Sequence, residues 1–346
     1  MKILVVGGAG YIGSHMVKML LGKGHEVITL DNLSNGHRDA VLGGVFVEGD
    51  LANIECLNEL FDRHRPEAVM HFASFIQVGE SVKKPDIYYQ NNVCNTLNLL
   101  NSMLKFGIKK FIFSSTAAVF GEPEYVPIDE LHPHKPMNPY GRSKLIIEQV
   151  LADYDKAFDF RFLCLRYFNA AGADPEGQLG ERHEPETHLI PLVIQAASGR
   201  RNNIQVFGSD YDTPDGTCIR DYIHITDLCS AHLAALEYLN EGGHSDLFNL
   251  GNGIGFSVQE IIDTVKKVSG KEVSVIHGPR REGDPARLVA DSQRAKSVLH
   301  WLPNYTELES IVSHAWLWEM KRQLLSDEFD ASVISYSASD AVDHVM

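Results

Sequence analysis

Three glycines, at positions 7, 10 and 13, constrain the fold of this chain more than any other feature. They lie in the run GGAGYIG, directly after the apolar segment 3–6 and before a helical pattern. In a strand–turn–helix unit the first glycine permits the tight turn, the second lets the backbone approach a pyrophosphate, and the third lets the helix pack closely on the sheet. The N–H groups that begin the helix attract phosphates. Gly7, Gly10 and Gly13 therefore predict a dinucleotide-binding βα unit.

A second apolar segment, 26–30, ends in Asp31. An acidic side chain at that point suits the hydroxyls of an adenosine ribose, which favours NAD over NADP as the ligand. The alternative is a tight turn that binds nothing, and the motifs further along the chain argue against it.

The first half of the chain alternates apolar segments with helical patterns. Strands are expected at 2–6, 26–30, 45–48, 68–72, 110–114 and 161–166, and helices at 13–23, 54–63, 89–106 and 139–154. This alternation predicts the α/β class, with a Rossmann-type doubly wound parallel sheet and a smaller α/β substrate-binding lobe.

The expected domain organisation follows a change in composition near residue 168. Residues 1–168 are predicted to form the NAD-binding domain, which a later strand near 246–251 rejoins. Residues 169–322, with loops rich in Gly, Pro and Asp, mainly form the substrate lobe. Residues 323–346 are acidic and rich in Ser, Asp and Ala, and a flexible tail is expected there.

Composition excludes several classes of partner. The 346 residues carry a formal net charge of −15, which disfavours nucleic acid and anionic membrane surfaces. The apolar run at the N-terminus is too short for a signal peptide, and no segment approaches transmembrane length. The five cysteines are scattered, without CxxC or zinc spacing. We therefore expect a cytoplasmic enzyme without a structural metal.

Tyr140 and Lys144 are the first candidates for chemistry. They lie four residues apart in a predicted helix, so their side chains share one face. An ammonium near a phenol favours the phenolate and lowers the pKa of the tyrosine, which can then act as a general base. The spacing alone also arises by chance, but its coupling to an N-terminal glycine fingerprint is far more specific.

Three hydroxyl residues, Ser114, Ser115 and Thr116, end an apolar strand where the ligand cleft is expected. A hydroxyl there can hydrogen-bond the reacting oxygen of a substrate, and Thr116 is our candidate. Turn and capping interactions are the alternative for serine and threonine at strand ends.

Together these motifs resemble the extended short-chain dehydrogenase/reductase family, and within it the 4-epimerases that act on UDP-glucose. The resemblance covers about residues 1–320. Further segments that carry it are VGES (78–81), LRYFN (165–169), DGTCIRDYIH (215–224), NLG (249–251) and RREGD (280–284).

The resemblance implies roles for individual residues. Tyr140 would be the base, Lys144 would lower its pKa, and Thr116, where serine is common, would hydrogen-bond the sugar. The residues implied to line NAD are Gly7, Gly10, Tyr11, Ile12, Gly13, Asp31, Asn32, Asn35, Asp50, Leu51, Phe72, Ala73, Asn91, Ser114, Tyr140, Lys144 and Phe168. Those implied for the UDP-sugar are Thr116, Tyr140, Asn169, His188, Leu189, Arg220, Arg281, Asp284 and Leu288.

The implied reaction is oxidation and then reduction at one carbon. The sugar 4-hydroxyl gives its proton to Tyr140 and its hydride to tightly bound NAD, the 4-keto sugar turns over, and hydride returns to its opposite face. Arg220 and Arg281 suit a diphosphate, because guanidinium groups bind phosphate oxygens bidentately. A homodimer is expected from the resemblance.

Several alternatives stay open. Leu288 stands where some relatives have tyrosine and His188 where some have asparagine, and a leucine leaves room for a 2-acetamido group, so partial activity on UDP-N-acetyl sugars is expected. Epimerases of UDP-glucuronate or UDP-xylose, a non-catalytic NAD sensor and a simple sugar dehydrogenase are further possibilities. A 4,6-dehydratase is disfavoured, because Ala117 and Ala118 replace its acidic pair and cannot transfer protons.

Overall fold

A seven-stranded parallel sheet forms the larger lobe of the computed structural model, which describes the backbone of residues 1–281 and 283–340 and the side chains as far as Leu324. The strand order is β10-β6-β5-β4-β1-β2-β3. The strands span β1 Lys2–Val6, β2 Glu26–Asp31, β3 Val45–Glu48, β4 Ala68–His71, β5 Lys110–Thr116, β6 Arg161–Tyr167 and β10 Asp246–Leu250. This order is that of a doubly wound Rossmann sheet, so the predicted fold class is confirmed.

Side chains of each central strand alternate between two hydrophobic cores. Ile3 and Val5 of β1 belong to one core, and Leu4 and Val6 belong to the other. The first core is closed by α1 (Tyr11–Gly22) and α8 (Ile225–Asn240), and the second by α2 (Ile54–His64), α5 (Asn95–Lys105) and α6 (Pro139–Phe158). Burial on both faces explains why the strands read as continuous apolar runs.

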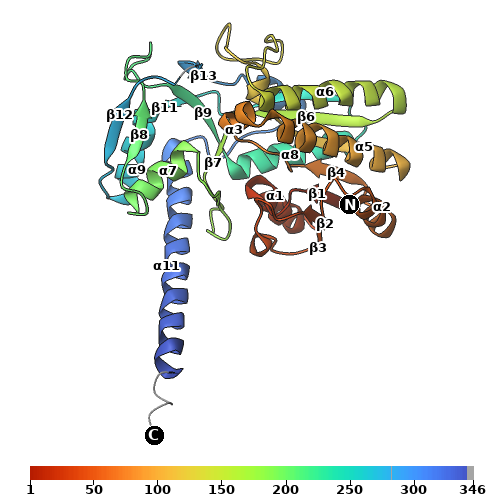
Figure 1. Cartoon of the computed structure of the whole chain (residues 1–346). Helices are drawn as coiled ribbons and strands as arrows, with labels where there is room; N and C mark the ends of the chain where they lie inside the picture. The colour runs from red at the N-terminus through yellow and green to blue at the C-terminus, as the bar shows by residue number, and fades with distance from the viewer. Residues whose placement is uncertain (282, 341–346) are drawn as a thin grey trace.

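The smaller lobe is built around a four-stranded sheet of β7 (Asn169–Ala171), β9 (Ile219–His224), β11 (Gly255–Ser257) and β13 (Arg287–Leu288). Strands β8 (Ile204–Phe207) and β12 (Val275–Gly278) pair beside it. Its own core joins α7 (Leu189–Ala197), α9 (Val258–Ser269) and the first part of α11 (Leu308–Asp340). Figure 1 shows this lobe beside the larger one, with α11 leaving the body of the molecule.

The remaining elements are short. They are α3 (Val78–Lys83), α4 (Pro85–Tyr89), α10 (Gln293–Val298), the 3₁₀ turns η1 (Arg38–Ala40) and η3 (Ala117–Val119), and the π-helical turn η2 (Gln90–Cys94). Where the sequence predicts one helix over 89–106, η2 follows α4 and precedes α5. The side chain of Asn92 leaves the helical pattern here to hydrogen-bond both polar groups of the Phe75 backbone, at 2.9 and 3.0 Å.

Helix α11 contains most of the segment for which the sequence predicts a flexible tail. The helix continues to Asp340, and residues 341–346 lie outside the described residues. Within the described ranges, no helix is both long enough and apolar enough to cross a membrane.

Candidate active site

The glycine loop lies at the point where the strand order reverses, between the carboxyl ends of β1 and β4. Gly7 follows β1 with φ of +79°, and a Cβ there would lie 2.5 Å from the backbone nitrogen of Ala73. A Cβ on Gly13 would lie 2.1 Å from the carbonyl oxygen of Gly7. The packing of the loop itself therefore requires two of the three glycines, as the sequence predicts.

Gly10 differs from the other two. Its φ of −80° and ψ of 178° suit any residue, and a Cβ would meet only the Gly7 carbonyl oxygen, at an ordinary distance of 3.4 Å. The fold does not need a glycine here, so the missing side chain leaves space in front of the N-terminus of α1. That space, beside free backbone N–H groups, fits the pyrophosphate of a dinucleotide.

The residues expected around the adenosine half gather beside this loop. Asp31 ends β2, is buried, and accepts hydrogen bonds from the backbone nitrogens of Ala9 at 2.9 Å and Leu33 at 2.8 Å. The Asn32 amide donates to Asp50 Oδ2 at 2.6 Å. Leu51 is buried and Asn35 is exposed. The Tyr11 hydroxyl donates to the Gly172 carbonyl oxygen of the smaller lobe at 2.7 Å. Ile12 packs against the core that contains Ile3 and Val5.

The residues expected nearer the reacting end follow β4 and η2. The Phe72 ring lies 4.9 Å from that of His232, and Asn91 donates to Asn92 Oδ1 at 3.0 Å. Asn92 in turn donates to Ser143 Oγ of α6 at 3.1 Å. The π-helical turn is thus tied to the helix that carries the catalytic candidates, and such turns frequently occur at functional sites.

Tyr140 lies in the first turn of α6 because Asn138 caps that helix, accepting from the Gly141 nitrogen at 2.9 Å, and Pro139 occupies its first position. Thr116, the last residue of β5, lies close enough to the Tyr140 phenol to act on its pKa. Burial raises the pKa of Tyr140, and the Thr116 side chain lowers it by less. The raised pKa differs from the lowered one that the sequence predicts, because removing the phenol from water outweighs the effect of the Thr116 side chain.

Lys144 is buried one turn after Tyr140. Its Nζ donates to the Ser114 carbonyl oxygen at 2.8 Å and lies 4.8 Å from the centre of the Phe113 ring. Burial lowers the pKa of Lys144 to about 7. The hydrogen bond to Ser114 therefore holds the Lys144 side chain on β5, one turn from the Tyr140 phenol.

A buried network that the sequence analysis did not single out lies behind this pair. Ser115 Oγ donates to Glu148 at 2.6 Å, and the guanidinium of Arg166, which is wholly buried, binds both oxygens of Glu148 at 2.9 and 2.6 Å. The network joins β5, β6 and α6. Its only signal in the sequence is the arginine within the apolar strand LCLRYF.

The hydroxyls of Ser114 and Tyr167 are hydrogen-bonded to each other. The Ser114 side chain therefore bonds to Tyr167 of β6, and its carbonyl oxygen accepts from Lys144 of α6.

Two residues expected to bind the substrate meet in the smaller lobe. Arg220 on β9 forms an ion pair with Asp284 and also donates to its neighbour's carbonyl oxygen. Asn169 on β7 donates to the Asp221 carbonyl oxygen at 2.8 Å. The guanidinium of Arg281 instead lies over the Phe207 ring, 4.0 Å from its centre. The Arg220–Asp284 pair fixes the orientation of one guanidinium, which suits directed phosphate binding.

Leu288 lies opposite Arg220 in the pairing of β13 with β9. It packs with Phe168 against a small apolar cluster that contains Phe120. Leu288, expected to set the volume of the sugar pocket, and Phe168, expected beside the nicotinamide, thus pack against the same cluster.

His188 and Leu189 begin α7, as the cap and first residue of that helix. The Nδ1 atom of His188 lies 2.7 Å from Glu181 and 3.0 Å from Glu186. Sequence reasoning included His188 but missed the two glutamates and His183, although the pattern Glu-x-His-x-x-Glu-x-His could have indicated them.

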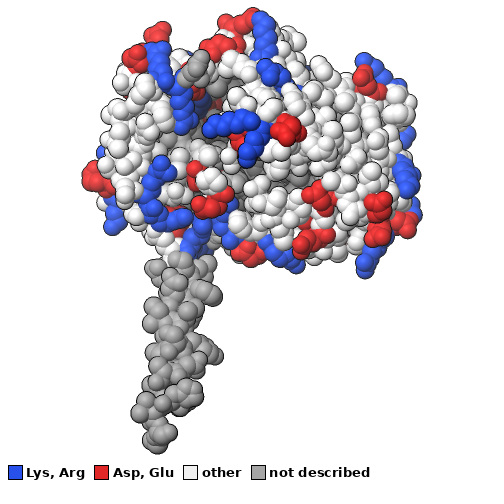
Figure 2. All heavy atoms as spheres, in the orientation of Figure 1, with Lys and Arg blue, Asp and Glu red and all other residues white. Residues whose placement is uncertain are grey.

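The surface carries charges of both signs. On the face drawn in Figure 2, basic and acidic side chains are interspersed. This face therefore presents no broad field of one sign that would favour nucleic acid.

Comparison with known proteins identifies relatives across almost the whole chain. The NAD dependent epimerase/dehydratase family matches residues 3–251. A UDP-glucose 4-epimerase of Rhizobium meliloti is 53% identical over 321 residues, which cover 93% of this chain and 98% of that protein.

Two solved structures are similar as well. A UDP-glucose 4-epimerase from Brucella ovis in complex with NAD has a TM-score of 0.90 and 48% identity, covering 91% of this chain and 97% of the other. A UDP-Glc/GlcNAc 4-epimerase from Campylobacter jejuni has a TM-score of 0.82 and 47% identity, covering 92% and 99%.

Proposed function

Because this chain belongs to the NAD dependent epimerase/dehydratase family, we propose that it interconverts UDP-glucose and UDP-galactose by inverting carbon 4 of the sugar. It is an NAD-dependent isomerase. The observation that carries the proposal is the hydrogen bond from Lys144 to the Ser114 carbonyl oxygen, which holds the helix of Tyr140 against the end of β5, where Thr116 lies.

Tyr140 is the residue that takes the proton of the sugar 4-hydroxyl and later returns it. Its raised pKa suits the return step, because a weakly acidic phenol holds the proton until the keto oxygen needs it. The Thr116 hydroxyl would stabilise the phenolate form of Tyr140, which exists before the proton is taken up and after it is returned. Lys144 adds positive charge one turn away and keeps α6 against β5.

NAD, when bound, accepts the hydride of carbon 4 and returns it to the opposite face of the ring. The glycine loop and the N-terminus of α1 would hold its pyrophosphate, and Asp31, with two backbone hydrogen bonds that fix its carboxylate, would bind its adenosine ribose.

The UDP part would be held in the smaller lobe, where Arg220 and Arg281 supply local positive charge on an acidic protein. Binding energy from this remote group retains the keto sugar while few contacts fix its ring, so the ring is free to turn over. We further propose that the protein acts in the cytoplasm as a homodimer.

Proton NMR of the purified protein with UDP-galactose and no added NAD tests this function. The expected result is UDP-glucose without net absorbance from NADH. Net NADH would indicate a dehydrogenase, and binding of NAD and UDP without conversion would indicate a sensor.

A second substrate class is favoured by Leu288. The C. jejuni relative is described as acting on both UDP-Glc and UDP-GlcNAc, and Leu288 is a half-buried side chain in the apolar cluster beside Phe168. We propose partial activity on UDP-N-acetylglucosamine. Leu288→Tyr should abolish that activity and spare UDP-glucose, whereas Leu288→Met, which conserves the volume, should spare both. An unmodified enzyme whose turnover on the acetylated sugar is below about one-thousandth of that on UDP-glucose contradicts the idea.

A further inference from the structure

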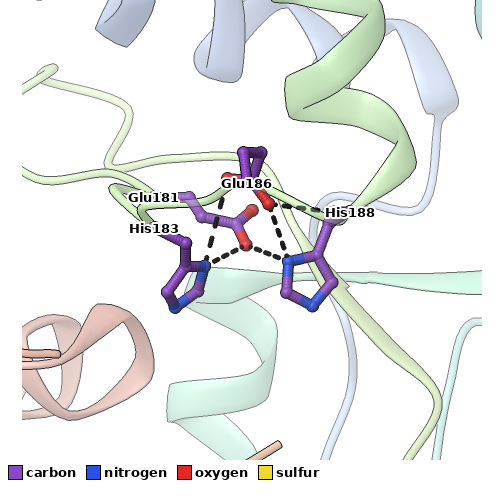
Figure 3. Close-up of side chains that lie close together, drawn as sticks. All are labelled: Glu181, His183, Glu186 and His188. Atoms are coloured by element: carbon purple, nitrogen blue, oxygen red, sulfur yellow. Dashed lines mark hydrogen bonds and ion pairs between the residues drawn. The ribbon is translucent and has the colours of Figure 1, made fainter. Parts of the chain in front are cut away.

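Four side chains in the loop between β7 and α7 converge on one point (Figure 3). They are Glu181, His183, Glu186 and His188, and one ligand atom from each lies within 4.8 Å of all the others. Glu181 Oε1 lies 2.9 Å from Nδ1 of His183 and 2.7 Å from Nδ1 of His188. Glu186 reaches His188 at 3.0 Å and His183 at 4.0 Å. Two imidazole nitrogens and two carboxylate oxygens thus surround a common centre.

The two carboxylates are buried, with side chains only 6% and 5% exposed for Glu181 and Glu186. Two buried negative charges side by side are strongly unfavourable unless positive charge compensates them. Arg182 follows Glu181 directly, yet its guanidinium binds Asp39 instead, at 2.9 Å. Protonated imidazoles, the Arg322 guanidinium that lines the same cavity, or a cation between the four groups can supply the compensation.

The four donor atoms, two imidazole nitrogens and two carboxylate oxygens, indicate which cation the cluster would bind. Both imidazoles present the same atom, Nδ1, to the shared centre, and a neutral imidazole binds a metal through such a lone pair. Two nitrogens and two carboxylate oxygens are ligands that Zn²⁺ accepts in a closed tetrahedral site. With metal–ligand distances near 2.1 Å, tetrahedral ligands lie about 3.4 Å apart. The four histidine–glutamate pairs, at 2.7 to 4.0 Å, lie within about 1 Å of that separation, and no two ligand atoms are more than 4.8 Å apart.

We propose that Glu181, His183, Glu186 and His188 form a binding site for one divalent transition-metal ion, with Zn²⁺ as the preferred ion. The site has four protein ligands within eight residues, which is the pattern of a structural rather than a catalytic metal. The sequence analysis expected no metal because it considered cysteine spacing.

The position of the loop indicates what the ion would stabilise. The His37 ring bonds to the Arg182 carbonyl at 3.1 Å, and the Trp318 indole of α11 donates to the Glu181 carbonyl at 3.2 Å. The Tyr11 ring lies edge-on to His183 at 6.5 Å. An ion at this point would brace the loop between the dinucleotide-binding helix and α7. His188 is also one of the residues implied to bind the UDP-sugar, so the ion would brace the loop at the edge of the proposed substrate site.

Metal uptake by the full-length protein tests the proposal. The protein is stripped with a chelator, dialysed, incubated with Zn²⁺ and analysed by mass spectrometry for bound zinc. We expect about one ion per chain and a rise in melting temperature on zinc addition. Co²⁺ in place of Zn²⁺ should give the strong visible absorption of a tetrahedral site, a readout that does not depend on activity.

Two variants and a control make the test specific. Glu186→Gln keeps the size of the side chain but removes its charge, and the double variant His183→Gln, His188→Gln removes both nitrogens. Each should lose stoichiometric uptake and the cobalt spectrum, whereas His244→Gln, at an exposed loop position, should retain both. Circular dichroism establishes that each variant is folded. The proposal is overturned if the unaltered protein binds less than about 0.1 ion per chain, or if the folded variants bind as much as it does.

Discussion

Lys144 donates a hydrogen bond of 2.8 Å from its ammonium nitrogen to the main-chain carbonyl oxygen of Ser114. The two residues are thirty positions apart, and the bond fastens the first turns of α6 to the end of β5. Tyr140, one turn earlier on the helix, is thereby held beside Thr116. The relative position of the proposed base and the Thr116 hydroxyl is thus fixed by a buried contact that belongs to the fold.

Replacing Tyr140 by phenylalanine removes the proposed base without changing the shape of the site. Because a positioned base typically contributes between about 10² and 10⁴ in rate, kcat should fall by that factor while NAD is still bound. Tyr154→Phe is the matched control: this half-exposed tyrosine of the same helix bonds to Asn101, and its loss should alter kcat by less than about twofold. Equal losses in both variants would show that the effect is structural.

The Thr116 hydroxyl lowers the pKa of Tyr140, so its removal should raise that pKa further. In Thr116→Val the acidic limb of the kcat–pH profile should move to higher pH by roughly one unit, the worth of one hydrogen bond. Thr116→Ser keeps the hydroxyl and should restore the original profile. An unshifted limb in the valine variant would remove Thr116 from the proposed mechanism.

The glycines at 10 and 13 should respond differently to alanine. A Cβ on Gly13 meets the Gly7 carbonyl oxygen at 2.1 Å, so Gly13→Ala should lower the free energy of unfolding by about 2–3 kcal/mol. Gly10→Ala meets only a 3.4 Å contact, so the loss of stability should stay below about 1 kcal/mol. Its effect should instead be loss of NAD from the purified protein.

Urea unfolding of the cofactor-free variants and release of bound nucleotide on denaturation measure the two effects separately. If Gly10→Ala retained NAD as fully as the unaltered protein, the open space at the start of α1 would not be the pyrophosphate site.

These two glycines also illustrate how much the sequence reveals. Turn geometry and strand periodicity are local, so the sheet, its class and the dinucleotide loop could be predicted. Two buried interactions join elements that are distant in the sequence: the bond from Lys144 to Ser114, and the bidentate pair of Arg166 with Glu148. No local sequence pattern predicts either of them. The raised pKa of Tyr140 depends on burial, which only the packed structure supplies.

The interruption of the helix predicted over 89–106 has a similar origin. Its apolar spacing is helical throughout, but the side chain of Asn92 is drawn to the Phe75 backbone in another part of the fold. A tertiary contact therefore overrode the local helical preference and produced the π-helical turn.

Buried histidines should make the protein sensitive to mild acid. Burial lowers the pKa of His71 and His224 to about 3, and that of His15 and His232 to about 4. Histidines in the unfolded chain titrate near 6.5, so below that pH they bind protons while the same histidines stay neutral in the native state. The free energy of unfolding should therefore fall as the pH drops from 6.5 towards 4, by up to about 1.4 kcal/mol per pH unit for each histidine.

Urea unfolding at pH 7, 6 and 5 measures this dependence. His71→Asn should reduce the slope by the contribution of one histidine, and an unchanged slope would show that His71 already carries a proton in the native protein.

The fate of the hydrogen on carbon 4 tests the central claim most directly. UDP-galactose deuterated at carbon 4 is converted by the purified protein in ordinary water, and the product is examined by NMR. If hydride is transferred to bound NAD and returned within the same site, the deuterium remains on carbon 4 of UDP-glucose. Loss of deuterium to solvent in proportion to conversion would contradict the account, because it would mean that the carbon exchanges a proton rather than a hydride.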